Sequence, residues 1–199
     1  MDTAFRSDGK FTQAEFCEWL AERPSHDHNR YELIGRHIVM TPPAGYPHSP
    51  IAATIVSAIH VHVERLGSGL VNDSSAGFEL PTGETVEPDA SYLSERTLVS
   101  APEPEIGKFY RIVPDLIVEI LSPATAKRDR TEKKQIYEKN GVGEYWIVDP
   151  NRRQVIVYRL AGNDYANAIH VVNGNVEASV LPGLSIPLSK IFASLDRKR

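Results

Sequence analysis

Residues 114–150 read PDLIVEILSPATAKRDRTEKKQIYEKNGVGEYWIVDP, and this stretch decides the fold of the chain. It starts with an apolar run, passes through a short turn into a charged segment, and ends in a second apolar run. This order predicts a buried strand, a helix and another buried strand, which together form a βαβ unit. Glu119 lies inside the first apolar run, where an unpaired charge would cost several kcal/mol. Because a buried acid there needs a cation or a proton, the unit is the predicted seat of chemistry.

The composition is that of an ordinary globular domain. A length of 199 residues and a hydrophobic fraction of 41% support one core, so we expect a single domain over residues 1–199. The net charge of −4 argues against a passive, sequence-independent nucleic-acid binder but allows an enzyme with one local basic surface. The lone Cys17 excludes an internal disulfide and a cysteine-rich zinc site. Residues 1–10 have no apolar signal core, and no run approaches about 18 apolar residues, so we expect a cytoplasmic protein.

Hydrophobic periodicity along the chain predicts a mixed sheet with helices. Helices are expected after a capping box at Thr12 and Glu15, from Ser49-Pro50 to about Leu66, over 126–139 before Asn140-Gly141, and at 188–192. Strands are expected as a hairpin over 31–40 with a turn near Gly35-Arg36, and at 77–80, 90–93, 115–121, 144–149, 154–159, 168–172 and 176–180. Residues 94–113 are interpreted as a surface excursion. The fold class is α/β of the α+β type, not a doubly wound nucleotide fold.

Two acids are candidates to accompany Glu119 at a hard cation. Asp115 shares a strand face with Glu119 but stands four residues away, roughly 13 Å at about 3.3 Å per residue. That is too far, because two carboxylates that share one ion lie about 4–5 Å apart. Asp89 opens the preceding strand after Pro88 and is the better partner. The structural alternatives are a turn residue at Asp89 and an ion pair between Glu119 and a lysine or arginine.

Lys133 is the third candidate of the site. It projects from the second turn of the predicted helix, near the end of the strand that carries Glu119. An ammonium there could orient a nucleophilic water or neutralise a developing oxyanion. Around it, Lys127, Arg128, Arg130 and Lys134 either form a solvated helix face or supply a local positive surface for phosphates.

The remaining polar residues give weaker signals. His60 and His62 are two apart on a helix and therefore face different directions. His48 precedes the Ser49 helix, where it either starts the helix or points at an anion. Glu32 is interpreted as a surface acid of the first extended run. No G-x-S-x-G, P-loop, G-x-G-x-x-G or H-E-x-x-H motif occurs.

Several of these segments occur together in a known order. They are YELI at 31–34, His48 before a helix, EPDASYL at 87–93, PDLIVEILSPAT at 114–125, RDRTEKKQIYEKNGVGEYWIVDP at 128–150 and VIVYRL at 155–160. In this order they resemble the Uma-two-type restriction endonuclease family, a branch of the PD-(D/E)XK nuclease superfamily. The resemblance runs from about residue 12 to residue 192.

The resemblance implies a restriction-endonuclease-like core of α-βββ-α-β type that holds one or two divalent metals at a bent sheet. Pro88-Asp89 matches the PD of the signature and Glu119 its second acid. Asp89, Glu119 and the Ile120 carbonyl would hold the metal. Glu32 corresponds to the acid often found near the first helix of such nucleases.

Two positions depart from the family pattern. Position 121 is Leu, where the simple E-x-K spacing has a lysine, and the lysine of this branch matches Lys133 on the following helix. IGRH at 34–37 stands where relatives usually carry Asp-Gly-Glu, which puts the local turn in doubt and leaves the metal residues unchanged.

The resemblance implies a Mg²⁺-dependent DNA endonuclease, with Mn²⁺ as an alternative ion. Metal-activated water would hydrolyse the phosphodiester bond, assisted by Lys133. The competing hypothesis is a catalytically inactive module of the same fold that binds nucleic acid or protein. We also expect a homodimer, because two-fold symmetry matches the two strands of DNA.

Overall fold

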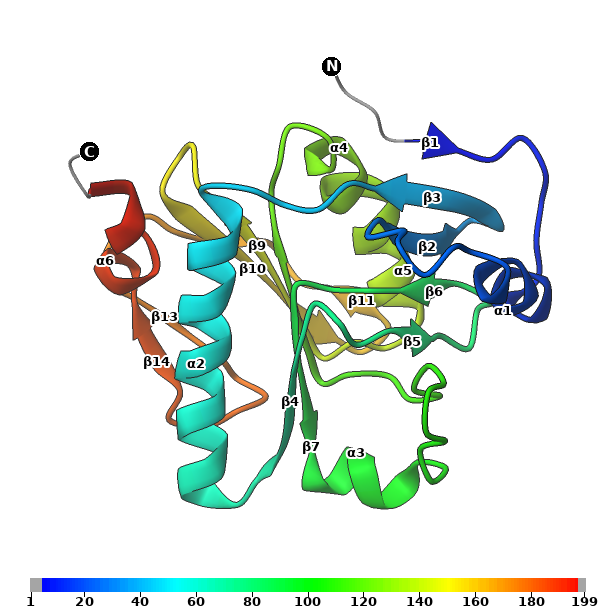
Figure 1. Ribbon diagram of the computed structural model, residues 1–199. Coiled ribbons are helices and arrows are strands. Elements are labelled where there is room, and N and C mark those ends of the chain that lie inside the picture. The colour runs from blue at the N-terminus through cyan, green and yellow to red at the C-terminus, as the bar shows by residue number, and fades with distance from the viewer. Residues whose placement is uncertain (1–4, 197–199) are drawn as a thin grey trace.

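A large mixed sheet forms the centre of the protein in the computed structural model, which describes residues 5–196 (Figure 1). The strand order is β11-β10-β9-β8-β7-β4, and β12 also pairs with β10. β8 and β9 run parallel, whereas β7 with β8 and β9 with β10 are antiparallel, which confirms the predicted mixed sheet. The strands are β4 (Gly69–Asp73), β7 (Ala90–Ser94), β8 (Leu116–Ile120), β9 (Glu144–Asp149), β10 (Gln154–Ala161), β11 (Asp164–Tyr165) and β12 (Ile169–Val171).

The parallel pair β8 and β9 is joined by the predicted charged helix. This crossover consists of α4 (Ala126–Arg128), a π-helical turn (Asp129–Lys133) and α5 (Lys134–Lys139), and the π-helical turn was not predicted. The helix ends at Asn140, and Gly141 follows with φ +78°, a left-handed conformation that glycine adopts without strain. Every residue of β8 and β9 is buried, as expected for parallel strands covered on both faces.

A second, antiparallel sheet contains the predicted hairpin. Its order is β1-β3-β2-β6-β5, formed by β1 (Phe5–Arg6), β2 (Arg30–Ile34), β3 (His37–Thr41), β5 (Phe78–Glu79) and β6 (Thr85–Val86). Gly35 and Arg36 have φ of 56° and 68°, so the two-residue turn connecting β2 and β3 lies where predicted. α1 (Gln13–Ala21) precedes the sheet and has the reciprocal Thr12–Glu15 capping box.

The long helix α2 (His48–Leu66) packs against the larger sheet (Figure 1). Its apolar residues recur four apart and lie in one core cluster with Val118 of β8 and Trp146 of β9. These helix residues are Ile51, Ile55, Ile59 and Val63.

The start of α2 differs from the prediction. The helix begins at His48, Pro47 is the N-cap, and no side chain caps this end. The Ser49 N–H donates instead to the carbonyl of Gly45, so Ser49 is inside the first turn and not at the cap. This shift places the His48 ring at the N-terminal end of α2, next to the larger sheet.

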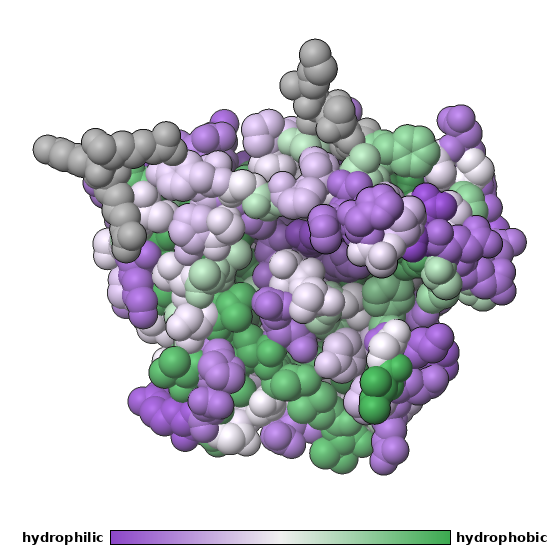
Figure 2. All heavy atoms as spheres, in the orientation of Figure 1, coloured by the Kyte–Doolittle hydropathy of each residue, from purple (hydrophilic) through white to green (hydrophobic). Residues whose placement is uncertain are grey.

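The segment 94–113 lies on the surface, as predicted, but contains the short helix α3 (Glu95–Ser100). Asp115, just before β8, accepts hydrogen bonds from the Ser94 N–H at 2.7 Å and the Thr97 hydroxyl at 2.9 Å. Asp115 therefore ties the start of α3 to the start of β8 and does not reach Glu119. Hydrophobic residues gather in the lower part of Figure 2, where α3 and the edge strand β4 lie.

The C-terminal part packs on the core of the larger sheet, where Ile186, Leu188 and Ile191 lie in the same cluster as the apolar residues of α2. β13 (Asn175–Glu177) and β14 (Ser185–Pro187) pair as a two-stranded sheet, followed by the predicted terminal helix α6 (Leu188–Ile191) and a 3₁₀ turn (Ala193–Asp196). The predicted domain over 1–199 extends beyond both ends of the described range. No helix within residues 5–196 is long and apolar enough to cross a membrane.

Candidate active site

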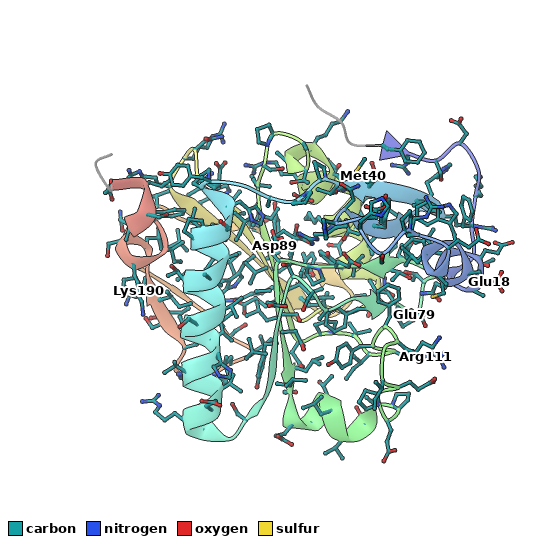
Figure 3. All side chains as sticks on the ribbon, in the orientation of Figure 1. Glu18, Met40, Glu79, Asp89, Arg111 and Lys190 are labelled. Carbon is teal, nitrogen blue, oxygen red and sulfur yellow. The ribbon has the colours of Figure 1, made fainter. Side chains whose placement is uncertain are left out.

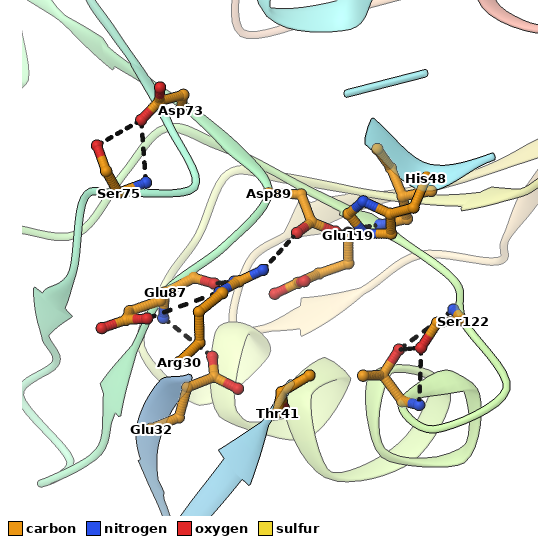
Figure 4. Close-up of polar contacts among 12 residues, drawn as sticks. Arg30, Glu32, Thr41, His48, Asp73, Ser75, Glu87, Asp89, Glu119 and Ser122 are labelled. Carbon is orange, nitrogen blue, oxygen red and sulfur yellow. Dashed lines mark hydrogen bonds and ion pairs between the residues drawn. The ribbon is translucent and has the colours of Figure 1, made fainter. Parts of the chain in front are cut away.

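Asp89 and Glu119 face each other across β7 and β8. The two strands are antiparallel with Ala90 opposite Val118, so the register one residue further sets Asp89 opposite Glu119. Opposite residues of an antiparallel pair project from the same face, with Cβ atoms about 5 Å apart. Asp89 lies in the middle of the molecule between α2 and the smaller sheet (Figure 3), and the close-up shows Glu119 beside it (Figure 4).

Asp89 is held by contacts from three different elements. Its Oδ1 accepts a hydrogen bond from the Arg30 guanidinium of β2 at 2.9 Å. Its Oδ2 accepts from the Ile120 N–H of β8 at 2.8 Å and lies 2.9 Å from Nε2 of His48, the first residue of α2. Burial opposes the charge of Asp89, but His48 and Arg30 outweigh it and lower the pKa of this carboxyl to about 2. Asp89 is therefore a fixed, ionised carboxylate.

Lys133 joins two acids from different sheets. Its Nζ lies 2.7 Å from Oε1 of Glu119 on β8 and 2.7 Å from Oε1 of Glu32 on β2. The Tyr137 hydroxyl donates to the same Glu119 oxygen at 2.7 Å. Lys133 is 2% exposed, and an ammonium buried to this degree is stable only when carboxylates surround it.

The charges of this cluster are set by burial against ion pairing. Burial raises the pKa of Glu119 to about 8, although Lys133 opposes the shift. For Glu32, burial acts in the same direction, but Lys133, Arg128 and Arg30 together lower the pKa below its usual value. Burial disfavours the Lys133 ammonium, yet Glu119 and Glu32 outweigh it and raise its pKa, so Lys133 stays charged.

The π-helical turn explains why two cations reach the same acid. Arg128 Nη2 lies 3.6 Å from Oε2 of Glu32, whose Oε1 binds Lys133. In a regular α-helix, residues five apart point about 140° away from each other, given 3.6 residues per turn. The hydrogen bonds of a π-turn span five residues and bring such side chains onto one side. The turn therefore directs Arg128 and Lys133 together into the site.

The oxygen atoms of this site fit a hard divalent cation. Both hydrogen bonds to Glu119 fall on Oε1, so its Oε2 has no hydrogen-bond partner among residues 5–196. The register sets Pro88 opposite Ile120, and proline has no N–H to donate to the Ile120 carbonyl. Carboxylate and carbonyl oxygens are the ligands that Mg²⁺ accepts. The described part of the chain has no group of three or more His, Cys, Asp or Glu side chains that could hold a metal, so the fit depends on two carboxylates and one main-chain oxygen.

A cavity of about 410 Å³ leads to these residues. Its walls come from the loop 42–47 before α2, the segment 122–125 after β8, and Pro150 and Asn151 after β9. Asp129, which is 1% exposed, also lines it, and its Oδ1 has no hydrogen-bond partner among the described residues.

Three interpretations from the sequence need correction. Glu32 is not a surface acid: it is 3% exposed, because the alternation in β2 turns it inward to Lys133. Arg128 is bound to Glu32, Arg130 to Asp149 at 2.6 Å and Lys134 to Glu138 at 3.6 Å. The four charges around Lys133 therefore do not form a positive surface for phosphates, because three of them are engaged by acids of the protein. The two roles considered as alternatives for His48 are both present, because it starts α2 and its ring contacts the Asp89 carboxylate.

Two residues of the cluster were not identified from the sequence, although a signal for each was present. Arg30 lies two positions before Glu32 in β2, and residues two apart in a strand share a face. Tyr137 lies four positions after Lys133, on the same side of the helix. Recognising either one required knowing that Glu32 and Lys133 face inward.

The comparisons with known proteins agree with this architecture. A model of the Uma2 family, described as putative restriction endonuclease, matches residues 13–189. The chain is also similar to the crystal structure of a putative nuclease from Anabaena variabilis, with 23% sequence identity and a TM-score of 0.77 over 93% of this chain and 99% of that chain. At this identity the likeness shows the fold. No curated protein matches the sequence.

Proposed function

The chain belongs to the Uma2 family, described as putative restriction endonucleases, and from this premise we propose that it is a Mg²⁺-dependent DNA endonuclease. The observation that carries the proposal is the position of Lys133, which is buried between Glu119 and Glu32 with Asp89 opposite Glu119. A purely structural core has little use for three acids and a lysine, because each buried charge must be compensated.

The carboxylates of Asp89 and Glu119 and the carbonyl of Ile120 would hold the cation. When bound, Mg²⁺ supplies a Lewis acid that activates water and neutralises negative charge on the phosphate, and Mn²⁺ can replace it. Arg30 and His48 keep the Asp89 carboxylate ionised and fix its orientation. The Tyr137 hydroxyl donates to one oxygen of Glu119 and fixes the orientation of this side chain.

Lys133 acts on the charge that develops during hydrolysis. Its ammonium is fixed by two acids and lines the cavity that a phosphate must enter. A donor that is already oriented needs no reorganisation when charge appears, and it is therefore stronger than a mobile surface lysine. Glu32 and the π-helical turn position Lys133, and Arg128 compensates the second oxygen of Glu32.

The test is a cleavage assay on purified protein. A mixture of supercoiled, linear duplex and single-stranded DNA is incubated with Mg²⁺, Mn²⁺ or EDTA, with the Asp89→Asn variant as a matched control. We expect metal-dependent products from the wild type and none from Asp89→Asn. Intact DNA under every condition would contradict the proposal.

The second candidate function is a catalytically inactive module of the same fold that binds nucleic acid or protein. The observation in its favour is that Asp89 and Glu119 already have cationic partners within the protein, Arg30 and Lys133. A calorimetric titration separates the two, because an enzyme of this type takes up Mg²⁺ at Asp89 and Glu119, whereas an inactive module does not.

We further propose that the protein is a homodimer. β4 is at one end of the larger sheet, and Leu70 of β4 and Val99 of the neighbouring α3 are 39% and 84% exposed. A strand at a sheet edge can pair with its own copy through a two-fold axis. Light scattering should give twice the chain mass of 22.1 kDa, and a mass of one chain at micromolar concentration would refute the dimer.

A further inference from the structure

The catalytic acids lie too deep for contact with the outside of a rigid helix. Asp89 is 3% exposed and Glu119 is 4% exposed, and both line the cavity of about 410 Å³. Under the proposed function, the phosphate to be cleaved must enter this cavity. Duplex DNA is stiff, with a persistence length of about 150 base pairs, and carries its phosphates on the outside of a rod. An unpaired strand can bend into the cavity.

A second cavity adjoins the first. It measures about 390 Å³ and shares Ser122, Pro123 and Asn151 with the wall of the first cavity. Arg130 and Arg152 line the second cavity but not the first. A strand that leaves the first cavity across the Ser122-Pro123 segment would therefore come to these two arginines.

Arg152 is the cation of the second cavity that has no acid partner. Its side chain is exposed, and within residues 5–196 only its main-chain N–H is engaged, with Asp149 at 3.1 Å. Arg130 is bound to the Asp149 carboxylate at 2.6 Å. A guanidinium with free donors next to a cavity can bind a phosphate through two parallel hydrogen bonds.

An aromatic ring stands at the first cavity as well. Tyr46 lines it and is 58% exposed, and its hydroxyl donates to the Ser194 carbonyl at 3.2 Å. Unpaired bases stack on such rings, whereas the bases of a duplex are already stacked on one another.

We propose that the two adjoining cavities bind an unpaired nucleic-acid strand, with the reacting phosphate near Asp89 and Glu119, a neighbouring phosphate on Arg152 and a base on Tyr46. This proposal rests on the proposed nuclease function for the identity of the reacting phosphate. The surface contacts to Arg152 and Tyr46 can be measured without any cleavage.

The experiment measures fluorescence anisotropy of a labelled oligothymidylate of about 12 nucleotides and of the same strand annealed to its complement. Mg²⁺ is replaced by Ca²⁺ in one series and by EDTA in a second series, and a denaturing gel verifies that the strand stays intact. We expect the single strand to bind more tightly than the duplex. Arg152→Ala should weaken single-strand binding about tenfold, as when one charged hydrogen bond is lost, and lower the slope of log affinity against log salt by about 0.7.

The neighbouring arginine provides the matched control. Arg153→Ala removes the same charge, but Arg153 is bound to Asp196 at 2.6 Å and does not line the second cavity. Its affinity and salt slope should equal those of the wild type. Equal losses for Arg152→Ala and Arg153→Ala would overturn the Arg152 site and leave only a general charge effect.

The outcomes also separate this inference from the proposed function. Preferred binding of the duplex would overturn the inference, even if Mg²⁺-dependent cleavage is observed. Single-strand binding that depends on Arg152 and is weakened by Tyr46→Ala would support the inference, even if no DNA is cleaved in the Mg²⁺ assay.

Discussion

Replacing Lys133 by methionine tests whether its ammonium holds the site together. Lys133→Met keeps the length of the side chain and removes the charge. The Nζ atom lies 2.7 Å from both Glu32 and Glu119, and Lys133 is 2% exposed, so water does not screen these pairs. Breaking a buried ion pair from one side costs about 3–5 kcal/mol, because the remaining charges stay buried. Arg128, 3.6 Å from Glu32, compensates part of this, so we expect the lower end, about 3 kcal/mol.

Thermal unfolding followed by circular dichroism measures this loss. At about 2–4 °C per kcal/mol for a chain of this size, the midpoint should fall by about 6–12 °C. In the same variant, turnover should fall by about 10²–10³ while metal affinity stays nearly intact, since Lys133 provides an electrostatic donor and not a metal ligand.

Lys134→Met is the matched control. Lys134 is rotated by about 100° around the helix and its side chain is 27% exposed. Its pair with Glu138 at 3.6 Å is exposed enough to contribute about 1 kcal/mol or less. If Lys134→Met reduces stability or turnover as much as Lys133→Met, the assignment of Lys133 is wrong and the two lysines are merely parts of one basic face.

Three further predictions concern separate regions. Asp89→Ala should abolish Mg²⁺ binding in a calorimetric titration, because it removes a ligand oxygen, and retained binding would exclude the proposed metal site. Gly69→Ala should lower the free energy of unfolding by about 1–3 kcal/mol, because a Cβ there would lie 2.0 Å from a carbonyl oxygen of β7. Gly45→Ala is the control, because a Cβ at Gly45 would have no atom within 4 Å, and denaturant titration should show no change in its stability. Burial and the nearby Glu79 raise the pKa of the Cys17 thiol, so iodoacetamide should alkylate Cys17 more slowly than a free cysteine at about pH 8. Glu79→Gln should accelerate this alkylation, and an unchanged rate would count against the contact between Cys17 and Glu79.

Local signals determined much of the fold from the sequence alone. The Thr12–Glu15 capping box fixes the start of α1, because it satisfies two donors at the helix end within four residues of chain. The parallel pair of apolar strands around a charged helix follows from hydrophobic periodicity, and Gly141 ends that helix because the left-handed conformation favours glycine. β4 was not predicted, because it is stabilised by pairing with β7 and by the packing of Val71 on the core, contacts that no local pattern specifies.

The inward direction of the polar residues was decided by tertiary structure. The sequence alternation of β2 defines two faces but does not say which of them is covered, and only the meeting of β2 with the crossover helix buries Glu32 against Lys133. The π-helical turn, which brings Arg128 to the same acid, has no periodic signature, because one extra residue in a turn is stabilised by the contacts it allows. His48 and Arg30 reach Asp89 from segments 41 and 59 residues away, and no local pattern can predict hydrogen bonds over such separations.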